Sequence, residues 1–189
     1  MKTHLFLALS VAVSLGIYAA EPTALSVWAP PPLAKVLRDA VPPSEGPGRL
    51  IIEGARNETG SAQAAVRPAA DVAAARASIS DLVHRKTGAV IPASAVTLQW
   101  ERYIAIDRNT TGIPGDELVA TAPNSIPDPF WEAATIQLQL GETQAVWLEA
   151  AIPADAAPGH YDGTLTVTTD GETAQLAVAL HVWNFAVPD

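Results

Sequence analysis

The sequence predicts an all-β protein, a two-layer antiparallel β-sandwich with a proline-rich N-terminal strap. Two observations support this. From Arg49 onward, short β-rich apolar runs alternate with turn signals about every ten residues, a pattern typical of sandwiches. Before them, residues 21–48 contain seven prolines. Because proline fixes φ and donates no hydrogen bond, that stretch forms neither a continuous helix nor a central strand.

These features divide the chain of 189 residues into four parts. Residues 1–20 are a signal peptide, 21–48 the extended strap and 49–187 the sandwich, and residues 188–189 begin a linker. Within the strap, residues 33–40 leave room for two helical turns between proline clusters. Apolar side chains at Trp28 and Val36 would hold the strap against a larger body.

The N-terminal segment has the parts of a secretory signal. Lys2 precedes an apolar run over residues 5–17, and small residues at Ala19 and Ala20 precede Glu21. As a helix this run spans roughly 20 Å, short of a hydrocarbon core of ~30 Å. We expect export to the periplasm, cell surface or medium, and no membrane attachment after cleavage. The alternatives are a buried N-terminal helix and an uncleaved anchor.

Composition excludes several classes of function. There is no cysteine, which removes disulfides, thiolate metal sites and cysteine nucleophiles. Lys and Arg number 11 against 20 Asp and Glu, and the basic residues are scattered. Without a basic stripe, nucleic acid would be repelled, so no nucleic-acid partner is expected.

Two internal strands carry a clear apolar face. Residues 135–140 alternate, with Ile136, Leu138 and Leu140 on the apolar side. Residues 96–106 place a longer set on one face, namely Val96, Leu98, Trp100, Arg102, Ile104 and Ile106.

The last strand, residues 172–185, follows the hairpin dipeptide Asp170-Gly171. Its core face carries Leu176, Val178, Leu180 and Val182. Trp183 and Phe185 fall on the opposite face with Ala177, Ala179 and His181. An exposed aromatic pair calls for a partner, which would be a downstream domain, the strap or a glycan.

The alanine-rich stretch is ambiguous. Helix propensity favours a helix over residues 71–83, and we lean slightly to it from the residues alone. Residues 75–82 also fit a two-residue period, with Ala77, Ile79 and Asp81 on one face.

Several motifs follow one another in the order of a known family. A strand enters Ala55-Arg56-Asn57-Glu58, and Gln63 begins the next strand. The remaining motifs are Val27-Trp28-Ala29 with Lys35-Val36, Ile126-Pro127-Asp128-Pro129, Ala145-Val146-Trp147-Leu148-Glu149, Pro158-Gly159-His160-Tyr161-Asp162-Gly163-Thr164 and Val182-Trp183-Asn184-Phe185. From about residue 25 to 189, the chain resembles the N-terminal domain of glycoside hydrolase family 123 and its relatives.

That resemblance implies a β-sandwich placed before a TIM-barrel catalytic domain, so that residues 188–189 would begin a linker to a catalytic barrel absent from this sequence. It also implies a strand at residues 75–82, against the helix reading. The barrel of family members cleaves N-acetylated hexosaminides, using the substrate's acetamido group and an adjacent Asp-Glu pair. Since that pair belongs to the barrel, no catalytic residue carries over to this sequence.

Arg56, Asn57, Glu58 and Gln63 lie at a strand–turn–strand junction. Paired charges and two amides suit a network that satisfies the backbone groups of the turn. We favour this structural role over ligand contact.

The remaining aromatic residues are candidates for sugar stacking or domain docking. Phe130 and Trp131 follow Pro129 and are expected in an exposed loop, whereas Trp100 and Trp147 lie among apolar neighbours and are expected in the core.

No catalytic, cofactor or metal site is expected. Asp116-Glu117 is the one Asp-Glu dipeptide, but neighbouring strand residues point to opposite faces and would not converge on one glycosidic oxygen. Calcium ligation by Asp107, Asn109, Asp116 and Asp128 is an alternative to ordinary surface loops, although these residues lack a fixed loop spacing.

The sequence therefore favours a non-catalytic accessory domain of a secreted glycoside hydrolase-like protein, supporting an N-acetylhexosaminidase-type barrel. A free-standing secreted carbohydrate-binding module is the main alternative, with a glycan as its partner. A hydrolase in its own right is the third hypothesis.

Overall fold

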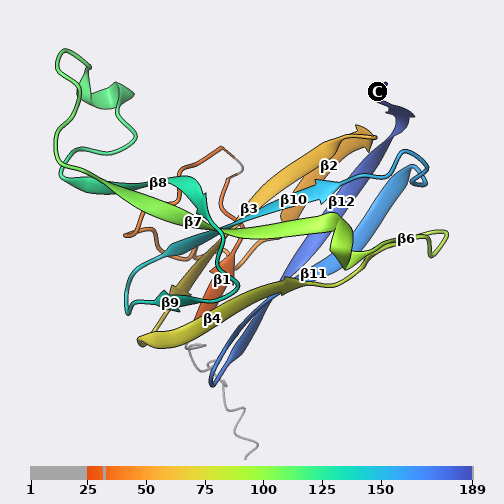
Figure 1. Ribbon diagram of the computed structural model, residues 1–189, viewed down its shortest axis with the longest axis horizontal. Helices are drawn as coiled ribbons and strands as arrows, with labels where there is room; N and C mark the ends of the chain where they lie inside the picture. Colours follow the sequence, from red (N-terminus) through yellow and green to blue (C-terminus); the bar gives the residue numbers. More distant parts are fainter. Residues whose placement is uncertain (1–24, 32, 189) are drawn as a thin grey trace, which may run out of the picture.

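The computed structural model describes residues 25–31 and 33–188. The expected signal peptide and Asp189 lie outside these residues. The described chain is all-β, with two sheets packed face to face and two one-turn 3₁₀ helices, η1 (Ala93–Ala95) and η2 (Gly115–Glu117). The two-layer sandwich predicted from the sequence is confirmed (Figure 1). Among these residues, no helix has the length and apolar character needed to cross a membrane.

The first sheet has five strands and is antiparallel throughout. Its order is β1 (Leu25–Trp28), β3 (Thr59–Pro68), β10 (Gln144–Ala151), β7 (Val96–Ile106) and β8 (Asn124–Trp131). β7 and β8 continue beyond the end of β10, whose pairing with β7 reaches only to Trp100.

The second sheet has seven strands. Its main order is β2 (Leu50–Arg56), β12 (Thr173–Ala186), β11 (Gly159–Thr169), β4 (Val72–Ile79) and β9 (Ile136–Leu138). β5 (Leu82–His84) also pairs with β11, and β6 (Val90–Ile91) pairs with β5. The pairing is antiparallel except between β2 and β12, which run parallel with Leu50 opposite Val178 and Glu53 opposite His181.

The inner faces of the two sheets form the core. The four residues predicted for the core face of the last strand, Leu176, Val178, Leu180 and Val182, are at most 1% exposed. From the five-stranded sheet, Val66, Val146, Leu148 and Trp100 join the same cluster. Because strand side chains alternate between faces, the intervening positions on β12 point outward, which places Trp183 and Phe185 on the solvent side.

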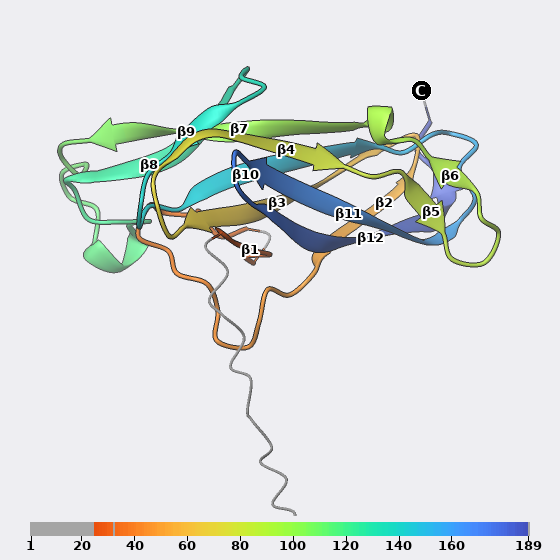
Figure 2. The ribbon, with the colours of Figure 1, turned by 90° about the horizontal axis from the view of Figure 1, so that it is seen from below.

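The strap covers part of the outer face of the five-stranded sheet. Its first strand, β1, pairs with β3, and the rest runs without regular structure to β2. Figure 2 shows this segment in orange, looping away from the layers before it returns. Trp28 and Val36 pack there against Ala65 and Ala145 in a small cluster separate from the main core. Turns replace the two helical turns that the sequence allowed at residues 33–40.

Side chains of the sheet supply the hydrogen bonds that the strap cannot make for itself. Arg67 Nη1 donates to the Ala40 carbonyl at 2.8 Å, and Tyr103 Oη donates to the Val36 carbonyl at 2.7 Å. The backbone amide of Thr143 donates to the Arg38 carbonyl at 2.8 Å. The strap is therefore integrated with the five-stranded sheet.

The slight preference for a helix at residues 71–83 is wrong, because β4 and β5 occupy that stretch. β4 pairs with β11 on one side and β9 on the other, so tertiary pairing overrides alanine's helix propensity. Ala75 is fully buried in this strand. The strand that the family resemblance implied at residues 75–82 is present as far as Ile79, and β5 begins at Leu82 after a short break.

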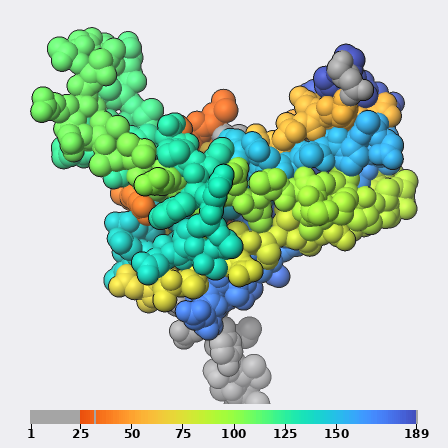
Figure 3. Space-filling model, in the orientation of Figure 1, coloured from red at the N-terminus to blue at the C-terminus, as the bar shows by residue number. Residues whose placement is uncertain are grey.

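Two apolar faces end earlier than the sequence suggested. Ile104 and Ile106 are 41% and 37% exposed because the far half of β7 pairs with β8 alone, beyond the second sheet. Leu140 is 61% exposed because β9 ends at Leu138. The segment between β7 and β8, which contains η2, projects from the same end of the molecule (Figures 1 and 3).

Candidate functional site

The C-terminal aromatic edge, defined as Trp183 and Phe185, lies on the outer face of the seven-stranded sheet. The two side chains are 41% and 51% exposed, and their ring centroids are 5.6 Å apart with the planes tilted by 41°. Ile51 and Val83 are also exposed, at 60% and 44%, at outward positions of β2 and β5. Large apolar side chains thus gather on this face, near the end of the described chain.

A polar row crosses the same face beside the aromatic edge. His160, His181 and Glu53 occupy paired positions on β11, β12 and β2. The imidazole rings are stacked at 4.4 Å, and His181 Nδ1 lies 3.7 Å from Glu53 Oε1. The face therefore presents aromatic, aliphatic and titratable groups together.

The Arg56-Asn57-Glu58 turn holds the end of the chain. The backbone amide of Ala55 donates to Glu58 Oε2 at 2.7 Å, and Asn57 adopts a left-handed φ of 62°. Asn57 Nδ2 donates to the Val187 carbonyl at 3.0 Å, while the Val187 amide donates to the Arg56 carbonyl at 2.9 Å. These bonds fix the exit of β12 against β2 and so orient the aromatic edge.

Arg56 adds a further feature to this turn. Its Nε is buried, and no hydrogen-bond partner for that atom is found among the described residues. Its backbone is paired with Ala186 on β12. Buried hydrogen-bond donors without a partner are rare in folded proteins, and this one lies at the junction of β2 and β12.

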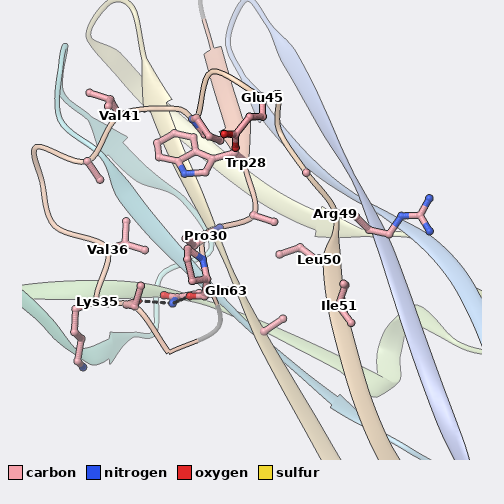
Figure 4. Close-up of a pocket in the computed structure, with 18 residues that line it drawn as sticks. Trp28, Pro30, Lys35, Val36, Val41, Glu45, Arg49, Leu50, Ile51 and Gln63 are labelled. Atoms are coloured by element: carbon pink, nitrogen blue, oxygen red, sulfur yellow. Dashed lines mark hydrogen bonds between the residues drawn. The ribbon is translucent and has the colours of Figure 1, made fainter.

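Gln63 lies away from that turn, in the outer face of β3. Its side-chain amide donates to the carbonyl of Ala34 in the strap at 2.5 Å. A groove of about 680 Å³ lies here between strap and sheet, with Trp28, Pro30 and Gln63 facing it (Figure 4). The structure thus brings Arg56, Asn57 and Glu58 together in one turn, whereas the side chain of Gln63 contacts the strap.

Phe130 and Trp131 end strand β8, which replaces the loop expected from the sequence. They are 41% and 46% exposed, but as neighbours in a strand they point to opposite faces. Phe130 is paired with Glu101 on the outer face, and its ring lies 5.9 Å from that of Trp147. Trp131 is paired with Trp100 and lies 5.8 Å from the guanidinium of Arg102.

Trp147 is half-buried on the outer face, so its assignment to the core is wrong, whereas Trp100 is buried in the core as expected. The sequence around Trp147 is apolar on both sides, with Val146 and Leu148 as neighbours. Alternation therefore could not tell which face is internal. The strand register decides it, because Trp147 is opposite Gln63 and Gln99 on the outer face of the sheet.

Under the strap lies an acidic group that the sequence analysis missed. Glu101 is only 6% exposed, and burial raises the pKa of its carboxyl, with Lys35 opposing the rise and Asp128 adding to it. Lys35 Nζ donates to the Pro127 carbonyl at 3.0 Å and lies 3.9 Å from Asp128. No sequence signal separates Glu101 from a solvated glutamate, because its burial depends on the strap.

The remaining acidic candidates are dispersed. Asp116 and Glu117 lie exposed in η2, on the projecting segment. Asn109 hydrogen-bonds the backbone of Ala120 and Ala122, and Asp128 faces Lys35. Within residues 25–31 and 33–188, His, Asp and Glu side chains form no cluster of three or more suited to a metal ion.

Comparison with known proteins agrees with this architecture. Residues 44–169 match the model of the glycoside hydrolase 123 N-terminal domain. No curated protein matches the sequence. A family 123 glycoside hydrolase from Clostridium perfringens, described for glycolipid glycan hydrolysis, superposes with a TM-score of 0.66 at 16% identity. The match covers 88% of this chain and 28% of that one, and at this identity it shows the fold.

Weaker structural matches carry no argument. The PapD-like domain 7 of human CEP192 gives a TM-score of 0.43 at 10% identity, covering 96% of this chain and 100% of that one. The sporulation control protein Spo0M from Bacillus subtilis gives 0.37 at 12% identity, covering 71% and 47%. The family model, which spans most of the sandwich, decides the assignment: this chain belongs to the glycoside hydrolase 123 N-terminal domain family.

Proposed function

We propose that this chain is a non-catalytic accessory domain of a secreted glycoside hydrolase-like protein, and that it docks on and supports an N-acetylhexosaminidase-type barrel. The observation that carries the proposal is the C-terminal aromatic edge, exposed on the sheet face next to the chain's exit.

The contrast between the two outer faces of the sandwich supports docking at that edge. The strap covers much of the five-stranded sheet. On the seven-stranded sheet, Ile51, Val83, Trp183 and Phe185 are each more than 40% exposed. Apolar groups gathered on one face mark an interaction surface, because burying them against a partner is favourable.

The kind of partner follows from the family. The Clostridium perfringens relative is a glycoside hydrolase, and this chain corresponds to 28% of its length. A barrel linked after β12 would begin beside the aromatic edge. The turn at Arg56 and Asn57 would then hold the junction at a fixed place relative to the docking face.

A non-catalytic role agrees with where the acids lie. Asp116 and Glu117 are exposed on the projecting segment, each in contact with water. The acid of a glycosidase pair works instead from an enclosed site facing a second carboxylate across the glycosidic bond. Glu101 is buried, and the charged groups that act on its carboxyl are Lys35 of the strap and the exposed Asp128.

A binding experiment tests the docking proposal. The purified chain is titrated with a separately expressed family 123 catalytic barrel in a calorimeter. We expect association that the double substitution Trp183→Ser and Phe185→Ser weakens at least tenfold, while Phe130→Ser, on the other sheet, leaves it unchanged. Equal affinity of the double variant and the parent chain would exclude this edge as the docking surface.

Activity is measured separately. The chain alone is incubated with an aryl N-acetylhexosaminide, and we expect no release of the aryl group above the uncatalysed rate. Any turnover by the purified chain would contradict the accessory role. The variants Asp116→Asn and Glu117→Gln would then show whether these two acids carry the activity.

We further propose export, based on the charged start, apolar run and small residues of segment 1–20. Expression of the full chain in a Gram-negative host should give a periplasmic or secreted form that begins near Glu21, as read by intact mass. A cytoplasmic product that retains Met1 would contradict this proposal.

A further inference from the structure

A second aromatic pair lies on the other outer face of the sandwich. Phe130 on β8 and Trp147 on β10 both point outward from the five-stranded sheet, where Phe130 is paired with Glu101 and Trp147 with Gln99 and Gln63. Their ring centroids are 5.9 Å apart and the planes are tilted by 31°. The 41% exposure of Phe130 and the half-buried state of Trp147 leave part of each ring open to solvent. We call these two rings the sheet platform.

The neighbours of the sheet platform are polar. Strand register places the outward side chains of the adjoining rows as Ser61, Gln63, Thr97, Gln99 and Glu149. Glu149 Oε1 accepts a hydrogen bond of 3.3 Å from Trp147 Nε1. Ser61 and Thr97 are exposed, and Gln99 and Glu149 are half-exposed. Flat rings are thus bordered by hydroxyl, amide and carboxylate groups.

The two outer faces of the sandwich differ in the large aliphatic side chains that they expose. The outer face that carries the C-terminal aromatic edge exposes the large aliphatic side chains of Ile51 and Val83, on the far side of the row formed by His160, His181 and Glu53. Beside the sheet platform, the outward positions of β3, β7 and β10 that the strap leaves open hold no large aliphatic side chain. A protein partner would therefore bury mainly hydrogen-bonding groups, which costs free energy unless each is paired.

A pyranose ring matches these groups in chemistry. Its C–H bonds form an apolar face that stacks on the electron-rich faces of aromatic rings, and its edge carries hydroxyl groups that bond to amides and carboxylates. The chain has 20 acidic residues against 11 basic ones, and Glu149 lies at the platform, so polyanionic ligands are disfavoured. We propose that Phe130 and Trp147 form a binding site for a neutral oligosaccharide, with Gln99 and Glu149 as its hydrogen-bonding partners.

The site is distinct from the proposed docking surface. The sheet platform belongs to the five-stranded sheet and the C-terminal aromatic edge to the seven-stranded sheet, on opposite outer faces of the sandwich. Sugar binding and barrel docking would therefore not compete. The domain would present a glycan-bearing surface to the partner enzyme while remaining attached to it.

The test is a titration of the purified chain, followed by its tryptophan fluorescence and by calorimetry. The probes are the linear hexasaccharides of N-acetylglucosamine, glucose and mannose. We expect saturable binding of at least one. Phe130→Ala and Trp147→Ala should each weaken that binding about tenfold, the worth of one aromatic stacking contact.

Trp131→Ala is the matched control. Trp131 is the chain neighbour of Phe130 with similar exposure, 46% against 41%, but it points to the other face. Its removal should leave the affinity unchanged. Thermal melting checks that each variant is folded, and Trp147→Phe retains a ring if Trp147→Ala does not fold.

Three results would overturn the proposal. These are no saturable binding of any of the three hexasaccharides, undiminished binding by Phe130→Ala, and an equal loss in Trp131→Ala. None of them bears on barrel association, which Trp183 and Phe185 report.

Discussion

The hydroxyl of Tyr103 on β7 donates a hydrogen bond of 2.7 Å to the backbone carbonyl of Val36 in the strap. The guanidinium of Arg38 lies over the same ring, 4.0 Å from its centroid. One aromatic side chain thereby joins the sheet to a segment that lies more than 60 residues earlier in the sequence. Because the strap makes few backbone bonds of its own, such contacts decide whether it stays in place.

The bond of Tyr103 predicts a pH-dependent contribution to stability. Tyr103→Phe should lower the free energy of unfolding by about 1 kcal/mol at pH 7. Burial raises the pKa of Tyr103, against the opposing effect of Arg38, so the folded protein holds this proton more tightly than the unfolded chain. The contribution is complete below the unfolded pKa of about 10 and is lost as the pH rises through the folded pKa.

Urea unfolding of the parent chain and Tyr103→Phe between pH 7 and 11 measures this effect. The stability difference between them should shrink above pH 10. A difference that stays constant to pH 11 would show that the hydroxyl does not titrate with unfolding.

Arg67 provides the second attachment of the strap. Its Nη1 donates to the carbonyls of Ala40 and Arg38, at 2.8 and 3.3 Å, and to Thr143 Oγ1 at 3.0 Å. Arg67→Met should lower the free energy of unfolding by about 2 kcal/mol, the range for hydrogen bonds from a charged donor. Cleavage within residues 29–49 by a nonspecific protease should also become faster.

Arg76→Met is the control for this substitution, since Arg76 is exposed on β4. Mass spectrometry of a protease time course identifies the cut sites. If both variants are cleaved alike, Arg67 does not hold the strap.

Ionisation of the Glu101 carboxyl should lower the stability of the folded protein, the opposite of its effect for most surface carboxylates. Burial raises the pKa of its carboxyl, and Asp128 adds to the rise against Lys35, so the folded state binds its proton more tightly than the unfolded state. Stability is therefore lost as the pH rises above the ordinary value of 4.5. Glu101→Gln removes this loss, so the variant should gain stability relative to the parent chain between pH 4.5 and pH 7.

Denaturant midpoints at the two pH values, with Glu149→Gln as a half-exposed control, measure that gain. A gain that does not grow with pH would mean that the carboxyl of Glu101 is ionised at no cost in the folded state.

A side chain at position 159 should be sterically unfavourable. The φ of Gly159 is +135°, which L-residues rarely adopt, and a Cβ built there would lie 2.5 Å from His84 Nε2. His84 is itself held by the Pro158 carbonyl and by an edge contact with Tyr161. Gly159→Ala should therefore lower the free energy of unfolding by about 2–4 kcal/mol.

Gly171 is the matched position, because a Cβ there would meet nothing within 4 Å. Gly171→Ala should change stability by less than about 0.5 kcal/mol. Thermal denaturation of both variants is sufficient, and similar melting temperatures would contradict the steric argument.

Patterns with one clear answer were read correctly from the sequence. The last strand alternates between large aliphatic and small or polar residues, so the core position of Leu180 and the exposure of Trp183 followed directly. The proline content of the strap excluded a continuous helix, although it left room for two helical turns at residues 33–40 and did not reveal that residues 25–28 pair with β3.

Predictions from the sequence were wrong where both faces of a strand carry similar residues, or where pairing with a distant segment determines the local structure. Trp147 lies between two aliphatic residues, and only the register with β7 shows that it faces outward. Helix propensity misassigned residues 71–83 because the partners of β4 lie more than 50 residues away. The prolines before Phe130 and Trp131 favour a loop, so the sequence does not show that the two residues end a strand and point to opposite faces.

The parallel pairing of β2 with β12 has a consequence for biosynthesis. The first strand after the strap finds its neighbour only when the final strand has left the ribosome, since Leu50 is matched with Val178. Until then β2 presents an unpaired edge, which is open to pairing with other molecules. No other pair of neighbouring strands in the seven described for this sheet is as far apart in sequence, so β2 is the strand that waits longest for its partner.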